Sequence, residues 1–146
     1  MQSVTSTWFE CAVKYERTTE DGTNKKVTET YVVEALSFTD AEQKITDEIS
    51  SYTNGEFEIK KISPMSINEI FFSDKDKDDK WYKCKLAFIT IDEKTQKEKK
   101  TTTSYLVQAS DLPTALNYML GEMNNTLVDF LTSNISETKI MDVYRK

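Results

Sequence analysis

Residues 8–15 alternate between apolar and polar side chains, which is the pattern of a half-buried β-strand. One face carries Phe9, Cys11, Val13 and Tyr15. Residues 25–35 alternate in the same way, and a polar segment with turn residues separates the two runs. The two runs are therefore predicted to form a hairpin with one apolar face.

A helix is predicted directly after this hairpin. Ala41, Ile45 and Ile49 recur every fourth residue, as on the buried stripe of a helix. Residues 39–42 have the sequence pattern of a capping box, which predicts Thr39 as the N-cap of the helix. Residues 56–72 then read as a strand region, and Pro64 is predicted to break or bulge it because proline cannot donate to a strand ladder.

The whole pattern is then repeated. Residues 81–88 repeat residues 8–15 at a distance of 73 positions, and residues 99–109 repeat 25–35 at a distance of 74. A second helix is predicted with Asp111 as its cap, Pro113 in its first turn and Ala115, Met119 and Met123 on its stripe. A third block, Ile62-Ser63 with Ile67, returns as Ile135-Ser136 with Ile140, again at a distance of 73. Three blocks in the same order indicate a tandem duplication, which predicts a pseudo-twofold axis.

The predicted fold class is α+β, with two pseudo-symmetric ββαβ(β) repeats in a single domain of residues 1–146. Repeat 1 covers residues 7–72, residues 73–80 form a charged linker, and repeat 2 covers residues 81–146. Antiparallel sheets are expected, with one helix per repeat on one face. An alternative frame is a permuted ββββα unit over residues 56–123, the element order of single-strand nucleic-acid binders of the PC4, Whirly and Pur type.

Composition excludes several kinds of chemistry. The chain has 146 residues, a net charge of −6 and no histidine, so it lacks the commonest general base and the commonest metal ligand. Three glycines and two cysteines supply neither a phosphate-binding loop nor the usual structural zinc site. Asp74, Asp76 and Asp78 resemble the opening of a calcium loop, but Asp79 and Lys85 stand where its glycine and glutamate belong. We expect no enzymatic activity, no metal and no cofactor.

Trp8 and Trp81 are the main candidates for a binding site. Each begins a strand on the face opposite the apolar one, and alternation places Lys14, Lys83 and Lys85 on those same faces. An aromatic ring beside lysines on an open sheet is the chemistry of a base-stacking platform for single-stranded nucleic acid. The alternative is that both rings simply pack.

Two further readings of function remain beside nucleic-acid binding. One is a protein-interaction or assembly module, with a protein partner or a second copy bound at sheet edges or at the pseudo-twofold surface. The other is an enzyme that uses carboxylates alone. The N-terminus has no signal-peptide pattern and no apolar run could span a bilayer, so a cytoplasmic location without membrane contact is expected.

Several blocks carry a family resemblance, and together they extend from Trp8 to Tyr144. The segments are WFECAVKYE, EDGTNKKVTETYVVEALSFTDAE, WYKCKLAFITIDEKTQKEKK and IMDVY. They resemble an uncharacterised family of small proteins from gut Bacteroidota and their crAss-like phages. This resemblance implies a phage or mobile-element setting, with DNA replication, recombination or host takeover as expected contexts, and the host cytoplasm as the location.

Overall fold

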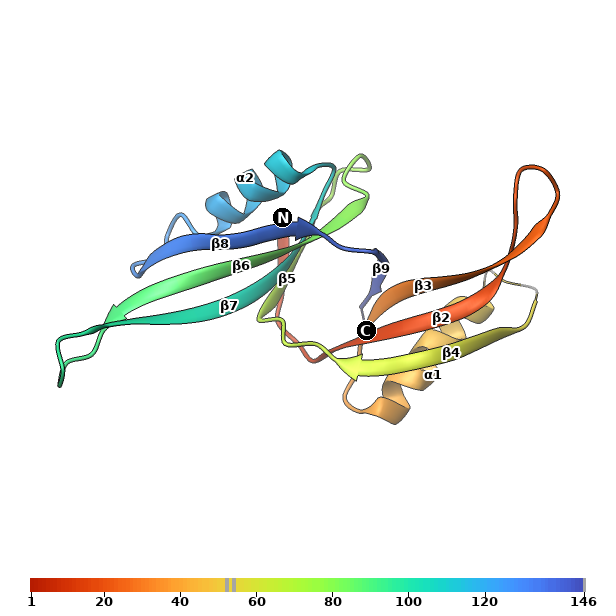
Figure 1. The fold of residues 1–146 in the computed structure, drawn as a ribbon, viewed down its shortest axis with the longest axis horizontal. Helices are drawn as coiled ribbons and strands as arrows, with labels where there is room; N and C mark the ends of the chain where they lie inside the picture. Colours follow the sequence, from red (N-terminus) through yellow and green to blue (C-terminus); the bar gives the residue numbers. More distant parts are fainter. Residues whose placement is uncertain (52, 54, 146) are drawn as a thin grey trace. The chain divides into compact units, whose positions relative to one another are not determined.

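The computed structural model describes residues 1–51, 53 and 55–145. Its elements are, in chain order, β1 (Gln2–Val4), β2 (Trp8–Thr18), β3 (Asn24–Glu34), α1 (Phe38–Ser50), β4 (Phe57–Pro64), β5 (Glu69–Phe72), β6 (Lys80–Ile91), β7 (Glu98–Ala109), α2 (Leu112–Glu122), β8 (Asp129–Glu137) and β9 (Ile140–Tyr144). Figure 1 shows them along the chain. The α+β class is confirmed, and each repeat reads ββαββ because the strand region after each helix splits in two.

The chain divides into two compact units. The α1 unit consists of residues 6–66 and 139–146, and the α2 unit consists of residues 1–5 and 67–138. Their sheets have the orders β4-β2-β3-β9 and β1-β5-β7-β6-β8. The units therefore do not coincide with the repeats, since the last strand of each repeat lies in the sheet of the other unit.

These exchanged strands are parallel to their neighbours, so the sheets are mixed and not purely antiparallel as expected. In the α2 unit β5 pairs with β7, and in the α1 unit β9 pairs with β3. The registers are equivalent: Glu69↔Tyr105 and Ile70↔Leu106 in one unit match Tyr31↔Asp142 and Val32↔Val143 in the other. The element order ββββα of the alternative frame does occur, as β4, β5, β6, β7 and α2, but these elements do not form one unit, because β4 lies in one sheet and β5, β6 and β7 lie in the other.

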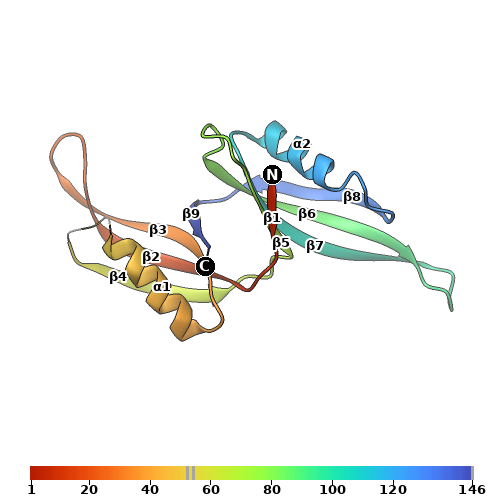
Figure 2. The ribbon, with the colours of Figure 1, turned by 180° about the vertical axis from the view of Figure 1, so that it is seen from behind.

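One helix packs on one face of each sheet, which we call the helix face; the opposite face is the outer face. Figure 2 shows α1 and α2 along their sheets. The predicted stripe residues Ala41, Ile45 and Ile49 are buried against the apolar face of β2 and β3. Ala115 and Met119 are buried in the same way in the α2 unit. The predicted periodicity is therefore confirmed for these five residues, whereas Met123, the third predicted stripe residue of α2, is the C-cap of the helix and is only partly buried.

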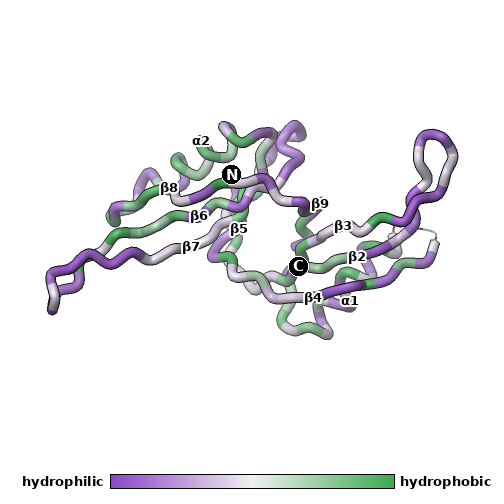
Figure 3. The backbone as a smooth tube through the Cα atoms, viewed as in Figure 1, coloured by the Kyte–Doolittle hydropathy of each residue, from purple (hydrophilic) through white to green (hydrophobic). Residues whose placement is uncertain are grey.

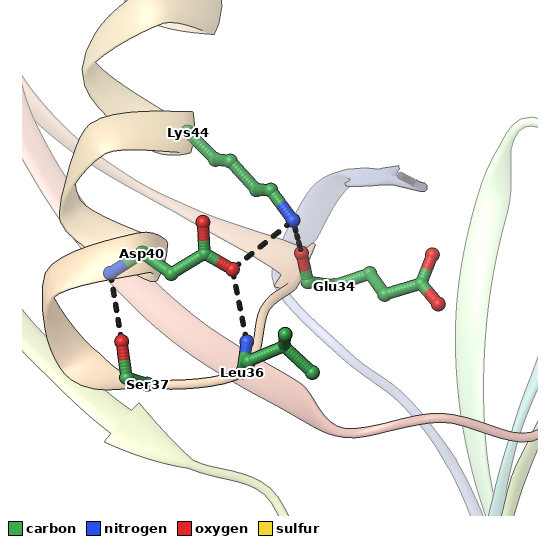
Figure 4. Close-up of polar contacts among 5 residues, drawn as sticks. All are labelled: Glu34, Leu36, Ser37, Asp40 and Lys44. Carbon is green, nitrogen blue, oxygen red and sulfur yellow. Dashed lines mark hydrogen bonds and ion pairs between the residues drawn. The ribbon is translucent and has the colours of Figure 1, made fainter.

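Helix α1 begins two residues earlier than the sequence predicts. Its N-cap is Ser37, whose hydroxyl accepts from the backbone N–H of Asp40 at 3.1 Å, while the Asp40 carboxylate accepts from the backbone N–H of Leu36 at 2.9 Å (Figure 4). The prediction of Thr39 as cap is wrong because the sequence contains two overlapping cap spellings, and the earlier one is used. In α2 the predicted cap Asp111 is confirmed, accepting from Thr114 N–H at 2.8 Å.

The same position on each helix is tied to the preceding loop or strand by different chemistry. In α1 the Lys44 ammonium donates to the backbone carbonyl of Glu34 at 2.6 Å and pairs with Asp40 at 3.2 Å (Figure 4). In α2 the Tyr118 hydroxyl donates to the carboxylate of Asp78 at 2.6 Å. The α1 contact thus ties the helix to the end of β3, and the α2 contact ties the helix to the segment before β6.

The charged segment 73–80 contains a buried carboxylate. Asp78 is 2% exposed, and its Oδ2 accepts from the hydroxyls of Ser73 and Tyr118. Burial alone would raise the pKa of Asp78, but these hydrogen bonds, with Lys77 and Lys75 nearby, bring that pKa below its ordinary value. As a charged linker, residues 73–80 are expected to be solvated, and this expectation is wrong at Asp78, which is buried and accepts a hydrogen bond from α2.

Candidate functional site

Both tryptophans are buried. Trp8 is 1% exposed and Trp81 is 2% exposed, and the Trp81 ring meets Phe72 edge-on with centroids 5.4 Å apart. A base needs a free ring face for stacking. In this structure neither ring offers one, so the tryptophans do not form the open platform that the sequence suggested.

The sequence predicts correctly on which face of its strand Trp81 lies, but the expectation that this face is open to solvent at Trp81 is wrong. Trp81 does lie on the outer face, with Lys83 and Lys85 following it along β6. That end of the outer face is nevertheless apolar and buried, since Ile70 and Leu106 are 0% exposed there. Each sheet thus buries both faces at the tryptophan end, and its outer face becomes polar further along the hairpin. Figure 3 shows the hairpin tips as hydrophilic.

The side chains that neighbour Lys83 and Lys85 on the adjacent strands are uncharged. Strand pairing places Lys83 between Leu106 of β7 and Ser136 of β8. It places Lys85 between Ser104 and Asn134. Among the described residues no carboxylate lies within ion-pair distance of either lysine; the ion pair at this end of β6 joins Lys80 to Glu137 at 3.8 Å. The two ammonium groups are therefore available to an external anion.

A row here means the side chains that lie side by side across β7, β6 and β8. Beyond Lys85, toward the hairpin tip, the next row of this face is mainly aliphatic and the one after it carries charges. Ala87 lies between Thr102 and exposed Leu131, and the next row holds Ile89, Lys100 and Asp129. We call the surface made by these four rows of β6, β7 and β8 the lysine face. The contributions of Asn134 and Ser136 could not be read from the sequence, because they depend on which residues of β8 pair with β6.

The equivalent face of the α1 unit carries balanced charges. Lys14 lies between Thr28 and Glu58, and Glu16 lies opposite Lys26. These side chains belong to a hollow of about 440 Å³, whose lining is Lys14, Tyr15, Glu16, Lys26, Gly55, Glu56, Phe57 and Glu58. Opposite charges on neighbouring strands attract each other. The predicted site residue Lys14 therefore has a glutamate beside it on the neighbouring strand, unlike Lys83 and Lys85, although that glutamate forms its ion pair with Lys60.

The two thiols have no reactive character. Cys11 and Cys84 are 0% exposed within the two helix-face cores. Burial, with a smaller effect of Glu10, raises the pKa of Cys11 to about 11, and burial raises the pKa of Cys84 to about 11. A thiol that stays protonated at neutral pH is a poor nucleophile and a poor metal ligand. Both cysteines act as small core residues, as their equivalent positions predicted.

The described part of the chain contains neither a cluster of metal ligands nor a membrane-spanning helix. Among residues 1–51, 53 and 55–145, no group of three or more cysteine, aspartate or glutamate side chains could hold a metal ion. Within the same residues, neither helix is long and apolar enough to cross a membrane. The lysine face is thus the surface whose chemistry most clearly differs from its counterpart.

Fold and surface together define an α+β protein of two tandem repeats, with two mixed sheets that each carry one helix. The chain belongs to the family described as a domain of unknown function, DUF4494, whose model matches residues 7–146. No curated protein and no solved structure matches the chain. The family resemblance read from the sequence is confirmed at this level, over nearly the whole length.

Proposed function

We propose that this protein binds single-stranded nucleic acid without catalysis, through the lysine face of the α2 unit. The observation that carries the proposal is the setting of Lys83 and Lys85. They lie on one face of one strand, in rows that contain hydroxyl and amide groups and no carboxylate. An ammonium group without a neighbouring carboxylate can neutralise a phosphate and release its counterions.

The spacing of the groups suits an extended chain of phosphates. Alternate residues of a strand lie about 7 Å apart, similar to successive phosphates in a stretched single strand. Hydroxyl and amide side chains such as Ser104 and Asn134 commonly add hydrogen bonds to phosphate and sugar oxygens. The aliphatic row around Ala87 and Leu131 offers the bases an apolar contact. Without an exposed aromatic ring on these rows, binding is expected to be weaker than on a stacking platform and strongly salt-dependent.

The overall acidity does not conflict with this proposal. The net charge is −6, but binding to phosphates depends on the local field of the surface that meets them. The acidic side chains of the α2 unit lie mainly in the segment 73–80, at the tip of the β6-β7 hairpin and at the ends of α2 and β8. The setting that we propose, replication or recombination of phage or mobile-element DNA, is supported by the resemblance of the sequence to proteins from that source.

A titration of labelled oligo-dT by fluorescence anisotropy, at several salt concentrations, tests the proposal. The double variant Lys83→Gln/Lys85→Gln should lower the slope of log affinity against log salt by about 1.4, because two phosphate contacts are lost. The matched control Lys14→Gln/Lys26→Gln, on the equivalent face of the other unit, should leave the slope unchanged. Tryptophan fluorescence should change little on binding, since both rings are buried.

Two outcomes would contradict this function. Absence of salt-dependent binding at micromolar protein would remove nucleic acid as the ligand. Equal effects of the two double variants would show that the lysine face is not the site. Lys14, Lys83 and Lys85 are half-buried and Lys26 is exposed, so thermal unfolding of both double variants is compared with that of the parent to exclude misfolding as the cause.

A protein-interaction module is the second candidate, and exposed apolar residues at the start of β8 favour it. Leu127 is 100% exposed, Val128 is 41% exposed and Leu131 is 53% exposed. They adjoin an edge strand, and exposed apolar residues beside a sheet edge are a frequent protein contact. Replacing Leu127 and Val128 by serine would weaken such a contact and leave the binding of oligo-dT unchanged.

A further inference from the structure

Strand β4 ends the order of strands in the α1 unit, and its pairing shows which of its backbone groups face outward. In the described chain β4 pairs with β2 alone. The Met65 N–H donates to the Trp8 carbonyl at 2.9 Å, and this pair continues the register of β4 on β2. Opposed residues of an antiparallel pair alternate between bonding each other and pointing away. Counting back from Met65, Ser63 bonds to β2, whereas Ile62 and Pro64 direct their backbone groups away from it.

The pairing of β2 with β3 leads to the same result. The Ala35 N–H donates to the Thr7 carbonyl at 3.1 Å, so by alternation Cys11, which lies opposite Ile62, bonds to β3. Pro64 fits as well, because a proline at an outward position of an edge strand removes no ladder bond. The N–H and C=O of Ile62 and the C=O of Pro64 therefore face the outer edge of β4, where no strand of the described chain takes them.

A hollow of about 320 Å³ lies between β4 and the first turns of α1, and Figure 2 shows the two elements side by side. Its apolar lining consists of Phe38, which is 55% exposed, and the half-buried Ile59 and Ile62. The Phe38 ring meets Phe9 edge-on with centroids 5.2 Å apart, so it is held in place although more than half of it is exposed. An extended chain beside β4 would place alternate side chains on this lining.

The strand side of the hollow is basic. Lys60 and Lys61 both line it, where the register of β4 on β2 shifts. Lys60 pairs with Glu58 at 3.4 Å, whereas Lys61 has no ion pair within the described residues. The two lysines against Glu42 leave the lining with one positive charge. The hollow therefore favours a ligand that brings carboxylates to β4 and apolar side chains to α1.

The equivalent surface of the α2 unit lacks these charges. It consists of Leu112, Pro113 and Leu116 on α2 and residues 132–135 on β8. Strand β8 also ends the order of its sheet. Ser133 and Asn134 stand where the α1 unit has its two adjacent lysines. The two units thus have similar edges that differ in charge, so a partner that prefers β4 is acidic.

We propose that the outer edge of β4 binds an extended acidic segment of a partner protein, in which apolar residues alternate with carboxylates. The main chain of the segment bonds to Ile62, and its apolar side chains lie against Phe38. Its carboxylates meet Lys60 and Lys61. Addition of a strand to a sheet edge gives affinity through main-chain hydrogen bonds and specificity through alternate side chains. This site is separate from the lysine face, which belongs to the other unit.

Two other occupants are disfavoured by the same features. A second copy of the chain, joined β4 to β4, would bring the lysine pairs of both copies onto one short seam, and like charges on neighbouring strands repel. A nucleic acid could contact the lysines, but it has no peptide backbone to pair with Ile62. Both occupants are distinguished from an acidic peptide by the test below.

The labelled peptide EVEVEVE is the probe, the full-length chain is the target, and fluorescence anisotropy is the readout. We expect saturable binding at one site per chain. The neutral peptide QVQVQVQ should bind about tenfold more weakly, because it lacks the carboxylates that meet the lysines. The peptide EVEPEVE should also bind about tenfold more weakly, the equivalent of one or two strand hydrogen bonds. Equal binding of the three peptides would overturn the proposal.

A matched pair of variants tests the lysines. Lys60→Glu/Lys61→Glu should weaken the binding of EVEVEVE at least about tenfold. Lys25→Glu/Lys26→Glu changes an adjacent lysine pair of the same unit by the same charge, and it should leave the affinity nearly unchanged. All four lysines are exposed, so both variants should unfold at the temperature of the parent. Equal weakening by the two variants would show that overall charge, and not the β4 edge, attracts the peptide.

Hydrogen exchange on the unaltered chain locates the site without any substitution. Added EVEVEVE should slow the exchange of the outward Ile62 N–H and leave Ile135, its counterpart on β8, unchanged. Protection at Ile135 instead of Ile62 would overturn the assignment to β4. Displacement of the peptide by oligo-dT, or self-association of the chain that blocks the peptide, would identify a nucleic acid or a second copy as the occupant and would overturn the proposal as well.

Discussion

The β2-β3 hairpin of the α1 unit and the β6-β7 hairpin of the α2 unit have the same strand pairing, and each pairs with a further strand, β4 or β8, through an equivalent register shift, yet their outer faces differ. The register shift lies between Ala12 and Val13 in one and between Lys85 and Leu86 in the other. On the outer face, however, Glu10 and Ala12 are replaced by Lys83 and Lys85, and Glu58 by Leu131. The duplication preserved the scaffold and let the surface diverge, so function is best sought where the two copies differ.

The second difference lies at the sheet edges. The α2 unit completes its sheet with β1, whereas the α1 unit ends at β9. The core positions show the opposite behaviour, because Cys11 and Cys84, or Tyr31 and Tyr105, keep both identity and burial. Residues that are identical in the two copies are therefore core residues. The two tryptophans are identical for the same reason, and not because they form a binding site.

Replacement of the tryptophans should produce the largest effect and should be equal in the two units. Trp8→Ala and Trp81→Ala each remove a fully buried ring, so each should lower the free energy of unfolding by about 3–5 kcal/mol. Urea unfolding followed by circular dichroism measures the change. Ile91→Ala, at a side chain that is 65% exposed, is the control and should change little. A tryptophan variant as stable as this control would show that its ring is not part of a core.

A smaller and pH-dependent effect is expected at the helix position shared by Lys44 and Tyr118. Tyr118→Phe removes a hydrogen bond to the buried Asp78 carboxylate and should cost about 1–2 kcal/mol at neutral pH. Lys44→Met removes contacts of a half-buried ammonium group in α1 and should cost less. Thermal unfolding of the two variants side by side measures the difference.

The pH dependence of Tyr118→Phe has a definite sign. The folded-state pKa of Asp78 is lowered, so its contribution to stability is present above its unfolded pKa of about 3.9 and is lost as the pH falls through the lower folded value. The difference between parent and Tyr118→Phe should therefore shrink below about pH 4. A difference that stays constant down to pH 2 would mean that the ionised carboxylate is not the acceptor.

The smallest effect should come from the cap of α1. Ser37→Ala removes the acceptor of the Asp40 N–H and should cost about 1 kcal/mol. Thr39→Ala, at the cap that the sequence suggested, should change stability by a few tenths of a kcal/mol at most. Chemical denaturation of both variants decides which residue begins the helix. If Thr39→Ala lowers the free energy of unfolding more than Ser37→Ala does, Thr39 is the N-cap, as the sequence predicts.

The elements of this fold could be predicted because their signals are local. Alternation identified the helix faces of β2 and β6, and the spacing of Ala41, Ile45 and Ile49 identified the stripe of α1. The cap of α1 was misplaced because Ser37 with Asp40 and Thr39 with Glu42 spell the same motif two residues apart. Hydrophobic periodicity does not distinguish between such overlapping starts, so only the backbone geometry decides.

The strand exchange and the candidate site could not be predicted, because both depend on non-local pairing. Nothing near Ile140 in the sequence indicates that this strand joins Thr30 rather than its own hairpin. The surroundings of Lys85 depend likewise on its pairing with Ser104 and Asn134. Alternation assigned Trp81 to its face correctly, but it could not show that a strand exchanged from the other repeat would make that end of the face apolar.

The position of β9 in the α1 unit also sets an order for folding during synthesis. Most of this unit is made early, yet its sheet is completed only by residues 140–144, which pair with a strand made more than a hundred residues before. Pairing across so long a stretch of chain is slow, because loop closure has to precede any gain from the contact. While the chain grows, the edge of β3 therefore stays unsatisfied and exposed to other strands. We expect the nascent protein to be most prone to aggregation, and most dependent on chaperones, in that interval.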